Sequence, residues 1–283
     1  MSQTDLNAPD EDKRRALKSL TDWWALAGIE PLPGAAPQAR RRPPTGSAEP
    51  ARKDAGGPPA PAATPAAARA AGFARDHGED APAQDGRAMA AAAHDLDALK
   101  ATLDSFEGCS LKHTARNLVF SRGDPKSPVM VVGEGPGREE DERGAPFVGR
   151  SGQLLDRMLA AIGLDPEQVY VSNVVFWRPP GNRKPTDAEI EACRPFAERH
   201  IELSKPKLLV FAGGIAAQTL LHAKSGIMSL RGRWAEYRVS ESETIPALPV
   251  FHPAFLLRRP AEKARAWQDM ISLQKRLETL QTD

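Results

Sequence analysis

A glycine-rich turn is the first stretch of the sequence whose residue types suggest chemistry. It reads Gly133-Glu134-Gly135-Pro136-Gly137 and follows the apolar run 129–132. Such a run predicts a buried parallel strand that ends at the carboxyl edge of a sheet. Because glycine has no Cβ, backbone N–H groups in the turn can approach a ligand closely and bind it. A tight turn without a ligand has the same pattern, whereas the dinucleotide fingerprint requires Gly-x-Gly-x-x-Gly spacing, which this turn lacks.

Two other hydrogen-bonding residues, Asn173 and His252, are expected where strands end. Asn173 lies in the expected strand 169–175, and His252 follows the expected strand 247–251. Ligands of parallel α/β sheets bind beyond the carboxyl ends of the strands, so we expect Glu134, Asn173 and His252 to share one edge. Taken alone, Asn173 is better explained as an ordinary turn residue at the end of a strand.

Strands alternate with helices from residue 128 onward, which predicts a three-layer α/β/α domain with a mainly parallel central sheet. The expected strands are 128–133, 169–175, 207–212 and 247–251, and the expected helices are 151–163, 187–203, 215–222 and a long one from Ala261. Thr186 and Glu189 form a capping-box pattern at the start of the second helix. Leucines at helical spacing predict one earlier helix over residues 89–106, and residues 234–239 are a polar stretch.

A series of motifs continues from the glycine turn and spans roughly residues 105–280. They are Gly-Glu-x-Pro-Gly with a following Glu-Asp, Pro-Phe-Val-Gly-Arg-Ser-Gly-Gln-Leu-Leu from Pro146, Tyr170–Val175, Arg178–Arg183, Glu191–Pro195, Leu230–Trp234 and Phe251–Ala254. In content and order these motifs resemble those of family 4 uracil-DNA glycosylases. The resemblance implies their fold and a monofunctional DNA N-glycosylase of base excision repair, which flips uracil out of DNA and leaves an abasic site. The main alternative is a non-catalytic nucleic-acid-binding module on the same fold, and the second is a small-nucleotide-binding protein.

The resemblance also implies how uracil would be held. Asn173 would read O4 and N3–H of the base through its amide. Backbone N–H groups around Gly135 would face O2, and Phe147 would stack on the pyrimidine ring. A site that pairs every polar group of uracil rejects cytosine, because cytosine would leave buried polar groups unmatched.

The same resemblance implies the catalytic groups. His252 would donate a hydrogen bond to O2 of uracil, where negative charge develops as the glycosidic bond breaks. A neutral imidazole can do this without storing positive charge. Glu134 and Asp141 are the preferred carboxylates for orienting the attacking water, and a solvated acidic turn is the alternative interpretation of both.

DNA contacts are expected from cations in the loops around this site, because cations neutralise phosphates. The candidates are Arg150, Arg183, Arg231, Arg233 and Arg258. In enzymes of this superfamily the loop after His-Pro wedges into the duplex, which makes Leu256 a candidate wedge. The alternative for Leu256 is burial in the first turn of a helix.

Family 4 enzymes resemble one another in holding a [4Fe–4S] cluster on four cysteines. The corresponding positions here read Phe106, Cys109, Trp177 and Cys193, and the chain contains only two cysteines. Because such a cluster takes four protein thiolates, the sequence requires no cofactor. Cys109 and Cys193 would be metal ligands only if a cluster were held, and we expect Phe106 and Trp177 to fill its volume instead.

The composition excludes several classes of protein. The chain has 283 residues, with 38 Lys and Arg against 37 Asp and Glu, so net charge alone does not indicate nucleic-acid binding. Two widely spaced cysteines argue against a disulfide framework and suit a reducing compartment. With no apolar run near the roughly 18 residues that span a bilayer and no signal peptide, we expect a cytoplasmic monomer without a membrane partner.

Residues 1–86 differ from the remainder in composition. A short helix is expected within residues 1–28, and its Trp23-Trp24 pair either docks on the main domain or binds a protein partner. Residues 29–86 are rich in Pro, Ala, Gly and Arg, which predicts a disordered linker. The catalytic domain is expected to occupy residues 87–283.

Overall fold

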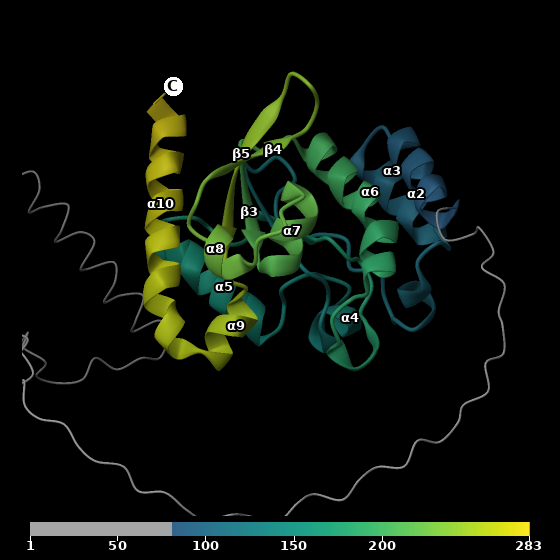
Figure 1. Cartoon of the computed structure of the whole chain (residues 1–283), viewed down its shortest axis with the longest axis horizontal. Coiled ribbons are helices and arrows are strands. Elements are labelled where there is room, and N and C mark those ends of the chain that lie inside the picture. Colours follow the sequence, from purple (N-terminus) through teal and green to yellow (C-terminus); the bar gives the residue numbers. More distant parts are fainter. Residues whose placement is uncertain (1–80, 283) are drawn as a thin grey trace, which may run out of the picture. The chain divides into compact units, whose positions relative to one another are not determined.

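The computed structural model describes residues 81–282 (Figure 1). The helix expected within residues 1–28 and nearly all of the expected linker lie outside the described residues. The described part begins with helix α2, Ala81–Ala92, whose first residues overlap the end of the expected linker.

Five strands form one sheet in the order β2-β1-β3-β5-β4. Their bounds are β1 Val129–Gly133, β2 Tyr170–Asn173, β3 Leu208–Ala212, β4 Ala235–Arg238 and β5 Thr244–Val250. The first four strands in that order are parallel, and only β4 is antiparallel to its neighbour β5. The polar stretch at 234–239 therefore contains an edge strand, in which Tyr237 is buried while its neighbours Glu236 and Arg238 are exposed.

Helices cover both faces of this sheet, which confirms the expected three-layer domain (Figure 1). One face carries α5 (Arg150–Ala161), α9 (Pro253–Arg258) and α10 (Lys263–Thr282), and the other carries α2, α3 (Leu96–Ser105), α6 (Asp187–Ser204) and α7 (Gly214–Leu221). Side chains of β1 alternate between the two layers, as the strand period requires. Val129 and Val131 pack with α5 and α10, whereas Met130 and Val132 pack with α3 and α6.

Helix boundaries follow capping residues. The single helix expected over 89–106 is two helices, because Asp95 caps α3 by accepting a hydrogen bond from the Ala98 N–H at 2.7 Å. The capping box at the start of α6 is confirmed, since Thr186 N–H donates to Glu189 and Glu189 N–H donates to Thr186 Oγ1. Among residues 81–282 no helix is long and apolar enough to cross a membrane.

Three connections leave the carboxyl edge of the parallel strands and build the site. The glycine turn after β1 leads into the short helix α4 (Arg138–Arg143). The segment after β2 includes the 3-10 turn Pro180–Asn182, and β5 leads through His252 into α9. Another short helix, α8 (Ile227–Leu230), precedes the edge strand.

Candidate active site

A cavity of about 470 Å³ opens at this edge of the sheet. Its walls are Glu134, Gly135, Pro136, Gly137, Glu140, Phe147, Ser151, Asn173, Pro179, Asn182, Arg183, Lys184, Pro185, His252, Ala254 and Arg258. The structure thus brings Glu134, Asn173 and His252 together, as their expected positions at strand ends suggested. Ser151 and Asn182 also line it, and sequence reasoning assigned neither a role; Glu140 lines it as well, and the sequence had offered it as a carboxylate that could orient water, ranked behind Glu134 and Asp141.

Close packing at Gly133 shapes the inner end of the cavity. A Cβ at this position would lie 2.5 Å from Asn173 Oδ1 and 2.6 Å from the Phe147 ring, so only glycine fits. Phe147 itself has a φ of 53°, a left-handed conformation that turns its ring toward His252. The two rings stack with centroids 5.5 Å apart and an angle of 29° between them. The two stacked rings form one flat wall of the cavity, and the polar side chain of Asn173 forms the wall beside it.

Asn173 supplies the polar wall. Its side chain is 2% exposed, and its Oδ1 is the one buried side-chain polar atom in the described residues without a hydrogen-bond partner. Leaving a buried acceptor unpaired costs about 1–3 kcal/mol. Because Asn173 lines the cavity, a ligand there that donates a hydrogen bond to this oxygen would recover that cost.

His252 is held as a neutral imidazole with a defined tautomer. Its Nδ1 accepts a hydrogen bond from the Ala254 N–H at 3.1 Å, so Nδ1 carries no proton and Nε2 carries one. Desolvation by the surrounding protein, with a smaller effect of the Arg258 cation, lowers the pKa of His252 to about 4. At neutral pH the residue therefore offers one N–H donor and no charge.

Glu134 is a half-buried carboxylate on the same cavity. Burial raises its pKa, and the nearby cations Lys184 and Arg258 oppose this rise. The carbonyls of Gly133 and Glu134 accept from Val174 N–H and Val175 N–H at 2.9 and 3.1 Å, which holds the turn against the end of β2. No hydrogen bond in the described part of the chain uses the N–H of Glu134 or Gly135, so both remain available to a ligand.

Glu140 joins the two glycine loops that border the cavity. One carboxylate oxygen accepts from the N–H groups of Val148 and Gly149 at 3.0 and 2.8 Å, and the other accepts from Gly137 N–H at 3.1 Å. Its side chain is buried, so these charge-assisted bonds are poorly screened. Glu140 thereby holds Phe147 and the glycine turn in register.

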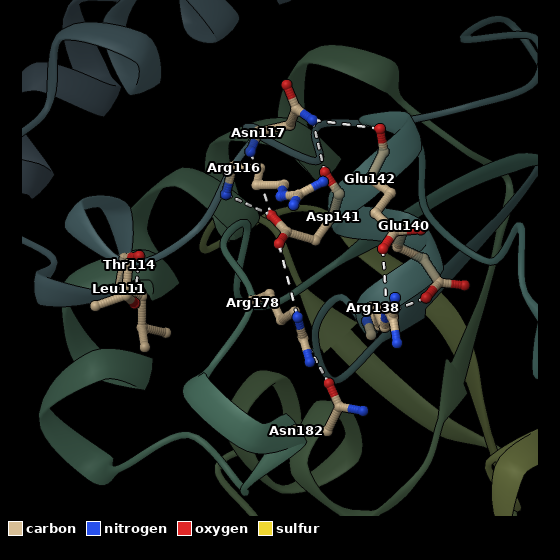
Figure 2. Close-up of polar contacts among 11 residues, drawn as sticks. Leu111, Thr114, Arg116, Asn117, Arg138, Glu140, Asp141, Glu142, Arg178 and Asn182 are labelled. Atoms are coloured by element: carbon tan, nitrogen blue, oxygen red, sulfur yellow. Dashed lines mark hydrogen bonds and ion pairs between the residues drawn. The ribbon is translucent and has the colours of Figure 1, made fainter.

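Asp141, the other carboxylate expected to orient water, is not among the residues that line the cavity. Its Oδ1 accepts from the N–H groups of Arg116 and Asn117 at 2.8 and 3.2 Å, and the residue is 3% exposed. Its Oδ2 lies 3.9 Å from the Arg178 guanidinium, whose Nε donates to Asn182 Oδ1 at 2.7 Å. Asp141 therefore anchors a chain of contacts that ends at Asn182 on the cavity wall (Figure 2).

Comparison with known proteins identifies the family. The sequence profile of the Uracil DNA glycosylase superfamily matches residues 120–271, more than half of the chain. The chain belongs to this superfamily. A type-4 uracil-DNA glycosylase of Sulfurisphaera tokodaii is 38% identical over 170 residues, which cover 58% of this chain and 77% of that protein. Type-4 uracil-DNA glycosylases of Archaeoglobus fulgidus and Pyrobaculum aerophilum are 38% and 34% identical, over 84% and 91% of their lengths and 58% and 62% of this chain.

The arginines expected to contact the DNA of a uracil-DNA glycosylase lie partly on the cavity wall and partly outside it. Arg183 and Arg258 line the cavity, and Arg183 is held there by two hydrogen bonds to Glu189 at 2.8 and 2.6 Å. Arg150 and Arg233 are exposed but lie outside this cavity.

Two of the residues expected to contact DNA, Arg231 and Leu256, have side chains that are engaged within the fold. The Arg231 guanidinium pairs with the buried Asp269 and lies over the Phe251 ring at 5.1 Å, so its charge is neutralised within the fold. Leu256 is fully buried at 0% exposure, whereas the next residue, Leu257, is 37% exposed.

The positions of the family's cluster cysteines do not fit an iron–sulfur cluster in this member. Cys109 and Cys193 are buried with their sulfurs 3.7 Å apart, but Phe106 and Trp177 are also buried and offer no thiolate. Phe106 packs on Phe196 with ring centroids 4.8 Å apart, and its ring would clash with a Cβ at Gly108. Residues 81–282 contain no group of three or more metal-binding side chains.

Proposed function

We propose that this protein is a uracil-DNA glycosylase that receives uracil flipped out of DNA and hydrolyses its N-glycosidic bond. Membership of the superfamily supports this proposal. At the level of the site, one observation carries it, namely the buried Asn173 Oδ1 that lacks a partner beside the stacked Phe147 and His252 rings. Uracil supplies what this wall lacks, because it has a flat ring and an N–H donor at N3.

Recognition follows from the donors and acceptors along the cavity. Asn173 Oδ1 accepts from N3–H while its amide nitrogen donates to O4, and Phe147 stacks on the ring. Cytosine has no proton at N3 and presents an amino group in place of O4, so both hydrogen bonds would be lost. Sites that pair a substrate polar group in this way reject analogues lacking it by about 10⁴-fold or more.

Bond cleavage leaves negative charge on the departing base, and preorganised donors are the largest contribution to stabilising it. The His252 Nε2–H is proposed to donate to O2, with the N–H groups of Glu134 and Gly135 beside it. Because His252 is neutral, it does not repel the positive charge that develops on the sugar. The Glu134 carboxylate is proposed to orient the water that attacks the sugar carbon.

No metal enters this mechanism. We propose that the protein works without a cluster, since Phe106 and Trp177 stabilise the surrounding loops by packing. Each such aromatic side chain buries about 150–250 Å² when enclosed. At about 25 cal/mol per Å², each contributes several kcal/mol.

The function is tested with the full-length protein and a single-stranded oligonucleotide that contains one uracil. Incubation followed by hot alkali is expected to cut the strand only at the uracil, because alkali cleaves abasic sites. Matched oligonucleotides with cytosine or thymine at that position should stay intact. Tight binding of the uracil oligonucleotide without any cleavage would instead favour the non-catalytic binding module.

A further inference from the structure

The loop between β2 and α6 carries an exposed polar side chain on the wall of the cavity. This residue is Asn182, the last residue of the 3-10 turn Pro180–Asn182. Gly181 and Asn182 both have left-handed backbones, with φ angles of 65° and 56°. Asparagine is one of the few residues other than glycine that adopt this conformation readily. A tight turn of the backbone therefore sets the position of the Asn182 side chain.

The loop is anchored on both sides of Asn182. Before the turn, the Arg178 guanidinium lies 3.9 Å from Oδ2 of the buried Asp141 on α4. After the turn, Arg183 donates two hydrogen bonds to the buried Glu189 on α6. Because buried carboxylates on two different helices hold its ends, the turn keeps a fixed place on the cavity wall.

The orientation of the Asn182 amide is fixed as well. Its Oδ1 accepts a hydrogen bond from Arg178 Nε at 2.7 Å, which turns the amide nitrogen away from Arg178 (Figure 2). Within residues 81–282, no group accepts a hydrogen bond from that nitrogen. An amide whose oxygen is already engaged acts as a donor through its two N–H bonds. Asn182 therefore offers a preoriented donor to a ligand of the cavity.

Position and charge indicate which acceptor this donor meets. Asn173 is buried at the inner end of the cavity, whereas Asn182 is exposed and so lies at its mouth. With uracil at the inner end, the mouth receives the sugar and phosphates of the same strand. Lys184 also lines the cavity, where burial raises the pKa of Glu134 and the Lys184 cation opposes that rise. A preoriented N–H donor beside a cation suits a phosphate oxygen.

We propose that Asn182 donates a hydrogen bond to a backbone phosphate beside the flipped uracil nucleotide, and that Arg178 positions it for this contact. The proposal rests on the proposed function, because the phosphate reaches Asn182 only when the uracil occupies the cavity. Arg178 acts through Asn182, since its own charge is directed at Asp141. The contact fixes the strand in place and carries no base information.

The test compares Asn182→Asp with Gln168→Glu in the full-length protein. Aspartate tolerates the left-handed backbone and still accepts from Arg178, but it replaces the N–H donor with a negatively charged oxygen. Gln168 is exposed and precedes β2 at the end of the strand away from the cavity, so it controls for one added negative charge. Thermal melts check that both variants fold. Dissociation constants are measured for a single-stranded oligonucleotide with one 2′-fluoro-2′-deoxyuridine, which resists hydrolysis.

Asn182→Asp should bind this strand about ten-fold or more weakly than the wild type, because the phosphate loses a donor and meets a like charge. Gln168→Glu should bind like the wild type. Neutral methylphosphonates placed one linkage at a time then locate the contact. At one linkage beside the modified uridine the loss should largely disappear, because no phosphate charge remains to repel the carboxylate. Wild-type affinity of Asn182→Asp, or the same loss at every linkage, would overturn the proposal.

A double-mutant cycle tests the positioning role of Arg178. Arg178→Lys keeps a positive charge near Asp141 and removes the Nε donor to Asn182, whereas Asn182→Gly fits the left-handed turn without an amide. If Arg178 acts through Asn182, Arg178→Lys should weaken binding several-fold in the wild-type background and hardly at all in Asn182→Gly. Equal losses in the two backgrounds would overturn the positioning role.

Uracil release by the wild-type protein separates this proposal from the proposed function. A wild-type protein that released no uracil would refute the proposed function, and the methylphosphonate comparison would still decide whether Asn182 meets a phosphate. Conversely, uracil release by the wild-type protein together with the same binding loss at every linkage would leave the proposed function intact and overturn the phosphate contact.

Discussion

Replacement of His252 separates its proposed chemistry from its structural role, because the two ring nitrogens do different things. Nδ1 accepts from the Ala254 N–H and thereby caps α9, whereas Nε2 faces the substrate in the proposed mechanism. His252→Ala removes both functions. His252→Asn keeps a cap, because an asparagine side-chain oxygen is a favourable acceptor at the start of a helix, but its shorter side chain does not reach O2 of uracil.

The expected magnitudes differ for the two functions. Loss of one donor to a developing oxyanion lowers the rate of bond cleavage by about 10²–10³, which is roughly 2.7–4 kcal/mol. Loss of a helix cap costs about 1 kcal/mol of stability. We therefore expect both variants to lose about 10²–10³ in the single-turnover rate. Only His252→Ala should also lose about 1 kcal/mol of unfolding free energy.

The assay combines single-turnover uracil release at saturating enzyme with urea unfolding. Binding is measured separately with a single-stranded oligonucleotide whose uracil nucleotide resists hydrolysis. Binding should change little in either variant, because the donor acts mainly on the charge that develops during cleavage. Recovery of the wild-type rate in His252→Asn would show that His252 acts only as a cap. An equal loss of binding and rate would refute its assignment to the transition state.

Three further predictions test other parts of the site. Asn173→Asp should reduce the preference for uracil over cytosine by at least about ten-fold in competing single-turnover assays, since a carboxylate cannot donate to O4 but accepts from the cytosine amino group; unchanged selectivity in a folded protein would eliminate Asn173 as the reader. Glu140→Gln should leave one of three loop N–H groups without an acceptor, at a cost of about 1–3 kcal/mol in urea unfolding, and lower the cleavage rate; wild-type stability and rate would refute the clamp. The unfolding free energy should fall as pH drops from about 6 to 4.5, by about 1 kcal/mol per unit, because the unfolded chain takes up two protons at His200 and His252, whose folded pKa values are about 3 and 4, while the folded chain takes up one at Asp269, whose pKa is about 6; a rise in stability over this range in urea titrations would contradict neutral histidines.

The pattern of apolar runs in the sequence was enough to predict the site residues that lie at the ends of strands. Parallel strands deliver their carboxyl ends to one edge, so Glu134, Asn173 and His252 could be placed together without knowledge of strand order. The antiparallel edge strand was missed because it buries only one of its residues, Tyr237. The break before α3 carried a readable signal in Asp95, which the alanine-rich leucine pattern obscured.

The partners of two charged residues expected at the site could not be predicted from the sequence. Asp141 is held by Arg116 and Asn117, and Arg231 is held by Asp269, 38 residues further along the chain. A charge in a loop can be interpreted as free only when its distant partners are known, and one sequence does not reveal them. Leu256 and Leu257 are one position apart along a helix, which turns the side chain by about 100° and leaves one buried and the other partly exposed.

One measurement tests the central claim most directly, namely that this cavity releases uracil from DNA without an iron–sulfur cluster. Full-length protein is purified anaerobically, its iron is quantified, and the free uracil released from an excess-enzyme reaction is measured in the same sample. The account predicts one uracil per substrate strand from a colourless protein with far less than one iron atom per chain. No free uracil, or release that occurs only in protein carrying about four iron atoms per chain, would contradict it.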